Sequence, residues 1–161
     1  MAHPAALSEV PRERRGDWGL AVGLALGLAA AGAFVLLLLR AQALPTGPVP
    51  VAWDKEACAH CRMHVGEARF AAQLQLADGR VLNFDDPGCL FSFRAKDQSP
   101  VHATYFHHYR QERWLTPAEA GFVPVMPTPM GFGLAAVDAA TPGSLSEDQA
   151  AARVRAKEGS R

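Results

Sequence analysis

The chain has 161 residues, of which 49% are hydrophobic, and its 16 basic and 16 acidic side chains give a formal net charge of zero. This balance argues against a nucleic-acid-binding protein, which requires a strongly basic face. About 115 residues follow the apolar N-terminal segment and its flanks, enough for one small domain with its own core.

The N-terminal segment predicts a membrane-spanning helix. The uncharged run Trp18–Leu39 would rise about 33 Å as a helix, enough to cross a hydrocarbon core of about 30 Å. Three arginines precede this run and one follows it: Arg12, Arg14, Arg15 and Arg40. The positive-inside rule therefore places residues 1–17 in the cytoplasm and everything after the helix in the periplasm of a Gram-negative cell. We predict a retained single-pass anchor of the inner membrane over residues 18–39.

A cleaved signal peptide is the alternative to a retained anchor. Ala41-Gln42-Ala43 fits the small-x-small cleavage pattern. The apolar run is longer than the 7–15 residues of a usual signal-peptide core, which favours the anchor. Both interpretations export the domain.

Residues 40–53 contain Pro45, Pro48, Pro50 and Gly47, which predicts a stiff, extended spacer. The domain proper is expected over 54–140. Its first strand is Phe70–Leu76, in which apolar and polar residues alternate as in a half-buried strand.

The remaining pattern predicts small strands and helices in alternation. Asp78-Gly79 is a hairpin turn, Asp86 and Pro87 begin a helix, and Thr116–Glu119 is a capping box that predicts a brief helix. Further strands are expected at 80–84, 101–109, 114–115, 122–125 and 131–137, and a helix with a weak apolar face over 146–157 within a C-terminal tail, 141–161. We predict an α+β domain with a mainly antiparallel sheet.

Cys58 and Cys61 form a C-x-x-C pair, whose thiols can converge on one ion or on each other. Three interpretations remain open. In a zinc-stabilised interaction module they would be half of a tetrahedral site completed by Cys89 and a histidine. In a thiol–disulfide oxidoreductase they would be the redox pair, although Gly66 and the strand from Phe70 interrupt the long helix that normally follows. In a soft-metal site they would bind Cu(I).

Met63 favours the third interpretation. Thioether ligation is rare for zinc and does nothing for disulfide exchange, whereas thiolate and thioether donors suit Cu(I); packing in the core is the alternative role for this side chain. His60 and His64 lie in the same segment and are candidate imidazole ligands. Cys89 lies in the first turn of a predicted helix, where the helix dipole lowers a thiol pKa and favours the thiolate; a buried, inert thiol is the alternative. Cys89 and Met130, which lies on a Pro/Gly-rich loop, complete the candidate metal ligands.

Other polar residues have simpler interpretations. Because the chain has three cysteines, at least one thiol remains unpaired even if the other two form a disulfide. This count favours a chemical role for the thiols over a structural disulfide. Asp85 and Asp86 are interpreted as a helix cap rather than a general acid/base pair. His102 and His108 share one face of a predicted strand and His107 the other, and we interpret all three mainly as surface or supporting groups.

Seven motifs follow one another along the chain. In order, they are Cys58-x-x-Cys61-x-Met63, Phe70-Ala71-Ala72-Gln73, Asp78-Gly79-Arg80, Phe84-Asp85-Asp86-Pro87-Gly88-Cys89-Leu90, Trp114, Ala118-Glu119-Ala120 and Thr128-Pro129-Met130-Gly131-Phe132-Gly133. Together they resemble the NosL family of copper-binding accessory proteins of nitrous-oxide reductase assembly. The resemblance covers most of residues 54–140. It implies a fold of two related β/α units, similar to one domain of organomercurial lyase, and an exported domain that passes copper to a copper enzyme or its transporter.

Two features depart from that family's usual pattern. Its members are usually lipoproteins with a lipidated cysteine near the N-terminus, whereas here Cys58 is the first cysteine and a membrane helix provides the tether. Arg62 stands where the family often has glycine, which alters the turn. We therefore expect a non-enzymatic, membrane-anchored Cu(I) metallochaperone with a copper enzyme or copper transporter as partner; nitrous-oxide reductase is one candidate recipient.

Overall fold

The computed structural model describes residues 16–41 and 43–160, and it contains two compact units, 1–43 and 44–161. The expected cytoplasmic segment 1–17 falls almost entirely outside the described residues, as does Gln42 of the possible cleavage motif.

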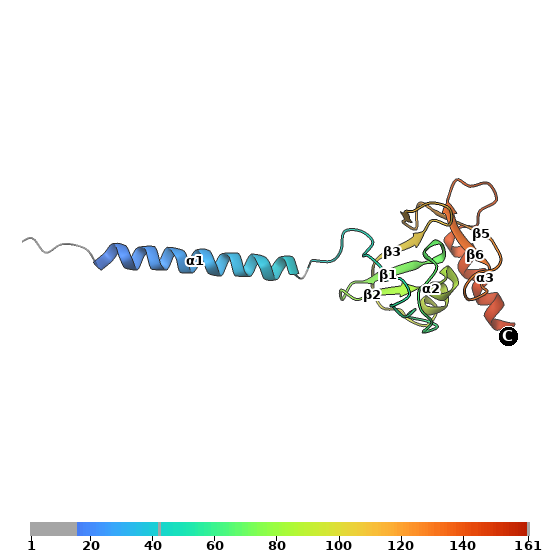
Figure 1. Cartoon of the computed structure of the whole chain (residues 1–161), viewed down its shortest axis with the longest axis horizontal. Helices are drawn as coiled ribbons and strands as arrows, with labels where there is room; N and C mark the ends of the chain where they lie inside the picture. The colour runs from blue at the N-terminus through green and yellow to red at the C-terminus, as the bar shows by residue number, and fades with distance from the viewer. Residues whose placement is uncertain (1–15, 42, 161) are drawn as a thin grey trace, which may run out of the picture. The chain divides into compact units, whose positions relative to one another are not determined.

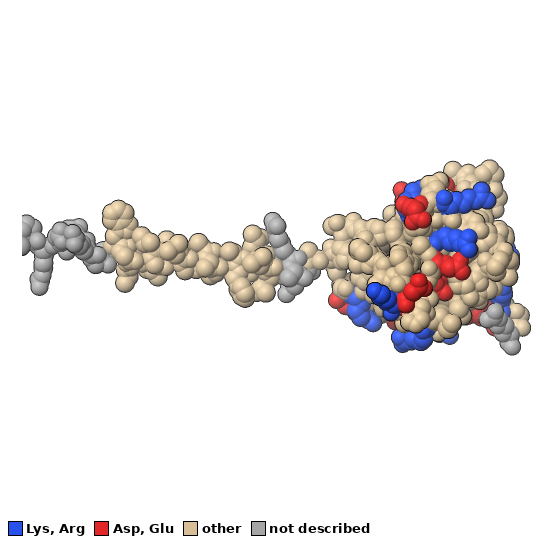
Figure 2. Space-filling view, in the orientation of Figure 1, with Lys and Arg blue, Asp and Glu red and all other residues tan. Residues whose placement is uncertain are grey.

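The first unit contains α1, Gly16–Ala41, which is drawn as one continuous helix in Figure 1. Its stretch Trp18–Leu38 is long and apolar enough to cross a membrane, and none of this stretch is buried against protein. Figure 2 shows the same stretch without charge, whereas both signs of charge are interspersed over the visible face of the second unit. The structure thus contains one N-terminal apolar helix that fits a membrane anchor or a signal sequence.

The second unit is built around a four-stranded antiparallel sheet. Its strands are β1 (Ala72–Leu76), β2 (Val81–Phe84), β3 (Val101–His107) and β4 (Trp114–Leu115), in the order β2-β1-β3-β4. Helix α2 (Pro87–Arg94) follows β2 directly and packs against β1 and β2. The sheet therefore brings the start of α2 close to the segment that precedes β1.

A second, two-stranded sheet follows in the chain. It pairs β5 (Ala120–Pro124) with β6 (Leu134–Asp138), and α3 (Glu147–Gly159) packs on β5 and α2. A short 3₁₀ turn, η1 (Ala68–Phe70), leads into β1. These small antiparallel sheets with helices confirm the predicted α+β class.

One hydrophobic core joins both sheets and both helices of this unit. Phe106 of β3 meets Phe122 of β5 edge to face with ring centroids 4.9 Å apart, and Phe91 of α2 contacts both rings. Ala150 and Val154 of α3 are buried in the same core, so this helix packs more firmly than its weak apolar pattern indicates. The predicted boundary between the 54–140 domain and its tail stays a prediction.

Three local expectations differ from the structure. All five residues of β1 are buried, because the segment 45–49 covers the face that the sequence assigns to solvent. That segment therefore packs on the sheet instead of serving as a free spacer. Thr116–Glu119 forms only a single turn, in which the Glu119 carboxylate accepts from the Thr116 backbone N–H, before β5 begins. Pairing in β3 ends at His107, two residues short of the predicted strand end.

Candidate metal centre

Two of the three cysteines lie on a tight loop before β1. An isolated antiparallel bridge between Ala57 and His64 closes this loop, and Cys58 and Cys61 lie inside it. Within the loop the Arg62 N–H donates to the Cys58 carbonyl at 3.0 Å. Arg62 has a φ of 67°, a left-handed conformation that favours glycine. The turn thus folds both thiols to one side at some cost in backbone strain. We call residues 57–64 the cysteine loop.

The third cysteine is presented by α2. Asp86 is the N-cap of this helix and its side chain accepts from the Gly88 N–H at 2.8 Å, while Pro87 occupies the first helical position. This confirms Asp86 as the expected helix cap, whereas the Asp85 side chain accepts from the Gly66 N–H instead. Cys89 follows within the first turn and is fully buried.

The three thiols converge although they come from two separate elements. The sulfur atoms of Cys58, Cys61 and Cys89 all lie within 4.8 Å of one another. Cys58 and Cys89 are buried and Cys61 is half-buried, so solvent reaches the cluster at one edge. Within the described part of the chain, no other group of three or more His, Cys, Asp or Glu side chains gathers this closely. Three sulfur donors on one side of a potential ion could bind a soft metal.

The surroundings of the cluster favour one thiolate, on Cys58. The Cys89 thiol donates to the Cys58 sulfur, and this bond lowers the pKa of Cys58 to about 5 against the opposing effect of burial. Backbone N–H groups of Cys61, Asp85 and His60 also stabilise the negative charge. At neutral pH the cluster therefore already holds a nucleophilic, metal-ready sulfur.

The other two thiols keep their protons more strongly. Burial raises the pKa of Cys61, and the neighbouring negative sulfur of Cys58 raises it further. The hydrogen bond to Cys58 holds the pKa of Cys89 far above its usual range, and burial acts in the same direction. A metal entering this site would have to displace protons from both groups if it bound all three sulfurs.

The other candidate ligands of the cysteine loop face solvent more than the thiols do. Met63 is 59% exposed, His64 is exposed and His60 is half-buried. Neither histidine belongs to the close cysteine group among the described residues. Their ligation, like that of Met63, stays a prediction.

Met130 lies on the loop between β5 and β6, which reaches the start of α2. Its backbone N–H donates to Asp86 at 3.4 Å, and its side chain is half-buried against the core. Phe132 of the same loop lies directly over Gly88, where a Cβ would come within 2.1 Å of the phenyl ring. The loop is thus fastened to the turn that carries Cys89, while Met130 as a ligand stays a prediction.

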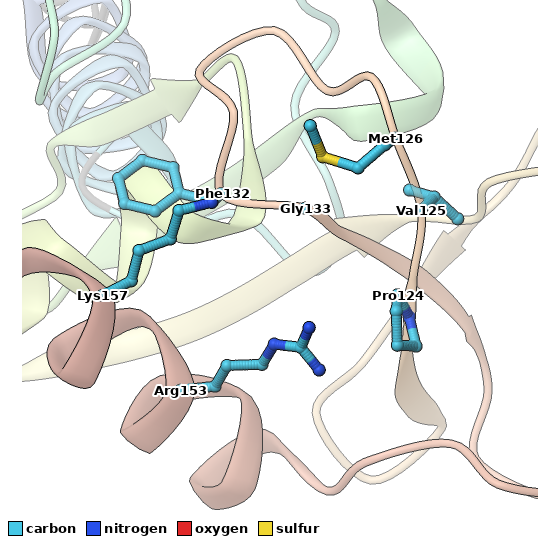
Figure 3. Close-up of a pocket in the computed structure, with 7 residues that line it drawn as sticks. All are labelled: Pro124, Val125, Met126, Phe132, Gly133, Arg153 and Lys157. Atoms are coloured by element: carbon cyan, nitrogen blue, oxygen red, sulfur yellow. The ribbon is translucent and has the colours of Figure 1, made fainter.

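A pocket of about 390 Å³ opens on the outer side of this loop, and Phe132 forms part of its wall (Figure 3). Met126 borders it from the loop, and Arg153 and Lys157 border it from α3. Among the described residues that line it, none is a cysteine. This hollow is therefore distinct from the sulfur cluster.

The strand histidines take other partners. His102 is exposed, whereas His107 and His108 are buried. The Nε2 atoms of the buried pair lie 3.6 Å from carboxylate oxygens of Glu112 and Asp138, respectively. These contacts agree with supporting roles in the fold.

Sequence reasoning missed the polar residues that hold the cysteine loop in place. Asp85 accepts from the Gly66 N–H at 3.0 Å with its side chain, and its backbone N–H faces the Cys58 sulfur. The backbone carbonyl of Asn83 accepts from the Ala59 N–H at 2.9 Å. Asp85 belongs to a sequence motif, but the sequence indicates a helix cap there and not this contact, whereas the role of Asn83 follows from the register of β2 and has no motif of its own.

Comparison with known proteins agrees with these observations. A family model described as NosL matches residues 48–154, more than half of the chain, and this range includes all three cysteines. No curated protein and no solved structure matches the chain. The likeness to organomercurial lyase therefore stays a prediction.

Proposed function

Starting from the fact that the chain belongs to the NosL family, we propose that it is a membrane-anchored, periplasmic Cu(I) metallochaperone that delivers copper for the assembly of a copper enzyme such as nitrous-oxide reductase. Copper is the cargo in this proposal. The NosL family comprises copper-binding accessory proteins that are generally non-catalytic, in agreement with a carrier role.

The observation that carries the proposal is the convergence of three thiols within 4.8 Å. Thiolates are soft donors that suit Cu(I), whereas hard cations such as Mg²⁺ and Ca²⁺ require oxygen ligands. Cys58 is already a thiolate in the metal-free site, so Cu(I) can bind its sulfur without displacing a proton. This supports a monovalent, sulfur-bound metal over a hard divalent ion.

Exposure at one edge supports transfer rather than storage. Cys61 is half-buried and Met63, two residues later, is 59% exposed. In this proposal both are the donors on the solvent side of the cluster. A thiol or thioether of a partner can approach there and replace these donors one at a time, while the buried Cys58 and Cys89 retain the ion. His60 and His64 supply further exchangeable ligands in the proposed set, and Met130 a further thioether.

The apolar helix supplies the tether in this proposal. The arginines before α1 favour a cytoplasmic N-terminus, which places the cysteine loop in the periplasm. Cleavage after Ala43 would release the same domain into the same compartment. The partner is then a recipient copper enzyme or a copper transporter that meets the domain at the membrane.

Anaerobic metal competition tests the proposal. We expect the reduced full chain in detergent to take one Cu(I) from a modest chelator, C61S to lose at least about 100-fold in affinity, and M63L to lose about tenfold. M126L changes an exposed methionine next to the separate pocket and should match the unmodified chain. Stoichiometric zinc in the purified protein, with no Cu(I) uptake, would remove the proposal and favour the zinc-stabilised module.

A thiol–disulfide oxidoreductase is the second candidate, because a low thiol pKa beside two other thiols also suits disulfide exchange. This alternative predicts a reversible Cys58–Cys61 redox couple and reductase activity that M63L leaves intact. The copper carrier predicts the opposite pattern, with metal affinity sensitive to M63L and no turnover of disulfide substrates.

A further inference from the structure

The chain segment that follows α1 is bound to one face of the four-stranded sheet by side-chain amides. We call residues 45–49 the strap. The Val49 N–H donates to Gln73 Oε1 at 2.8 Å, and Gln73 Nε2 donates back to the Val49 carbonyl at 2.9 Å. Gln75 Nε2 donates to the Gly47 carbonyl at 2.8 Å. Two glutamine side chains of β1, a strand that is paired on both sides, therefore hold the strap across the face of the sheet.

The Gln73 amide also bonds to Asn83, a residue that contacts the cysteine loop. Gln73 and Asn83 are cross-strand partners of β1 and β2, and Gln73 Nε2 donates to Asn83 Oδ1 at 2.9 Å. Asn83 Nδ2 in turn donates to Glu56 Oε2, and the other carboxylate oxygen of Glu56 accepts from the Ala52 N–H at 2.8 Å. An unbroken hydrogen-bond chain thus runs from the strap to the residue two positions before Cys58.

The backbone of the cysteine loop is fastened at the same place. The Ala59 N–H donates to the Asn83 carbonyl at 2.9 Å, and the Val65 N–H donates to the Glu56 carbonyl at 2.9 Å. Asn83 therefore holds the chain just after Cys58 through its backbone, while Glu56 holds it just before through both side chain and backbone. A shift of either residue would move the loop that aims Cys58 and Cys61.

Burial makes this chain of amides stiff. Gln73 is 0% exposed, Gln75 is 1% exposed and Asn83 is 9% exposed. Gln75 Oε1 already lacks a hydrogen-bond partner. While the strap covers it, a buried amide that loses a partner cannot turn to water instead, so the loss of one bond within the docked strap weakens the chain of bonds. Gln73 Oε1 then keeps the bond from Gln75 Nε2 at 3.0 Å.

We propose that Gln73, Asn83 and Glu56 are positioning residues for the cysteine loop, and that docking of the strap sets how readily this loop opens. Lifting the strap removes the two bonds between Gln73 and Val49 and opens the Gln73 amide to water, so that this amide holds Asn83 less firmly and the loop that carries two of the three thiols is freed. The coupling is a property of the metal-free protein; its consequence for copper release rests on the proposed function. A partner that displaces the strap would then accelerate copper transfer.

The first test uses V49P in the full chain in detergent, without metal. This substitution removes the N–H that Gln73 accepts and leaves every buried side chain in place. We expect amide exchange at Ala59 and alkylation of Cys58, located by mass spectrometry, to accelerate about tenfold, the effect of one buried hydrogen bond. V49A keeps the N–H and should match the unmodified chain.

A second pair of variants breaks the chain of bonds at its centre. Q73M removes the amide at similar size, and Q98M is the matched control at an exposed amide that donates to the Arg94 carbonyl. We expect Q73M to accelerate Ala59 exchange, Cys58 alkylation and, in copper-loaded protein, transfer of Cu(I) to a chelator. If Q73M unfolds globally, the V49P measurement alone decides the proposal.

Faster exchange confined to the strap, or no change in V49P, would overturn the coupling. The metal-free readouts separate the two proposals. If the chain binds no Cu(I) but V49P still exposes Cys58, the copper function fails and the positioning role stands; if copper binds and V49P changes nothing, the positioning role fails alone.

Discussion

Replacing Cys89 with alanine should raise the pKa of Cys58, because the Cys89 thiol is the largest influence that lowers it. Burial opposes the charged sulfur, and only the backbone N–H groups of Cys61, Asp85 and His60 remain to offset it. We therefore expect the pKa of Cys58 in C89A to rise from about 5 toward that of an ordinary thiol, about 8.5.

The magnitude is large enough to measure directly. A group with a pKa of about 5 is about 99% thiolate at pH 7, and one with a pKa of about 8.5 is about 3% thiolate. The thiolate absorbance of the metal-free protein, titrated in the ultraviolet, should show one ionised sulfur at pH 7 in the unmodified chain and almost none in C89A. Alkylation of Cys58 at pH 7 should slow in parallel.

C89S is the matched control. Its hydroxyl is close in size to the thiol and still donates a hydrogen bond, so the pKa of Cys58 should stay near the unmodified value while the third sulfur donor is lost. C58S should remove the low-pH transition altogether. A titration midpoint that is the same in C89A as in the unmodified chain, or the absence of any thiolate at pH 7, would refute the account of the cluster.

Three further predictions follow from local geometry. R62G should relieve the left-handed backbone at φ 67° and raise the free energy of unfolding by about 1 kcal/mol in chemical denaturation, whereas R62A should bring no such gain. G88A should lower that free energy by about 1–3 kcal/mol, because its Cβ would lie 2.1 Å from Phe132; unchanged stability would contradict the close packing. The free energy of unfolding of the reduced metal-free domain should rise from about pH 5 to about pH 9 and fall at higher pH. Between these pH values the folded Cys58–Cys89 pair holds one proton and the unfolded pair holds two; above about pH 9 the folded pair still holds one and the unfolded pair holds none. A profile that is flat over this range would contradict the shared proton.

The regular elements could be predicted because their signals are local. The alternation that leads into β1, the Asp78-Gly79 turn and the cap at Asp86 each depend on residues close together in the chain. The NosL family was identified in the same way, from short motifs in the correct order.

The burial of Gln73 and Gln75 could not be predicted in this way. On a strand with one apolar face, polar residues at alternate positions predict a solvent-facing surface. Here the strap covers that surface, since both glutamines satisfy its backbone groups. The same fact explains why Pro-rich residues, which suggest a free spacer, are part of the folded unit.

The metal centre could be predicted in part. The sequence identifies Cys58 and Cys61 as a pair and Cys89 as a candidate, but the distance between Cys89 and the pair depends on how α2 packs on the sheet. Likewise the thiolate character of Cys58 arises from a neighbour that is remote in sequence and close in space. The helix dipole argument suggested Cys89 as the acidic thiol, whereas the structure favours Cys58.

X-ray absorption at the copper edge of the anaerobically loaded full chain tests the central claim most directly. The account predicts monovalent copper with a first coordination shell dominated by sulfur, and a lower sulfur count in C58S, C61S and C89S. A shell of nitrogen and oxygen, or a spectrum that none of these substitutions changes, would contradict it.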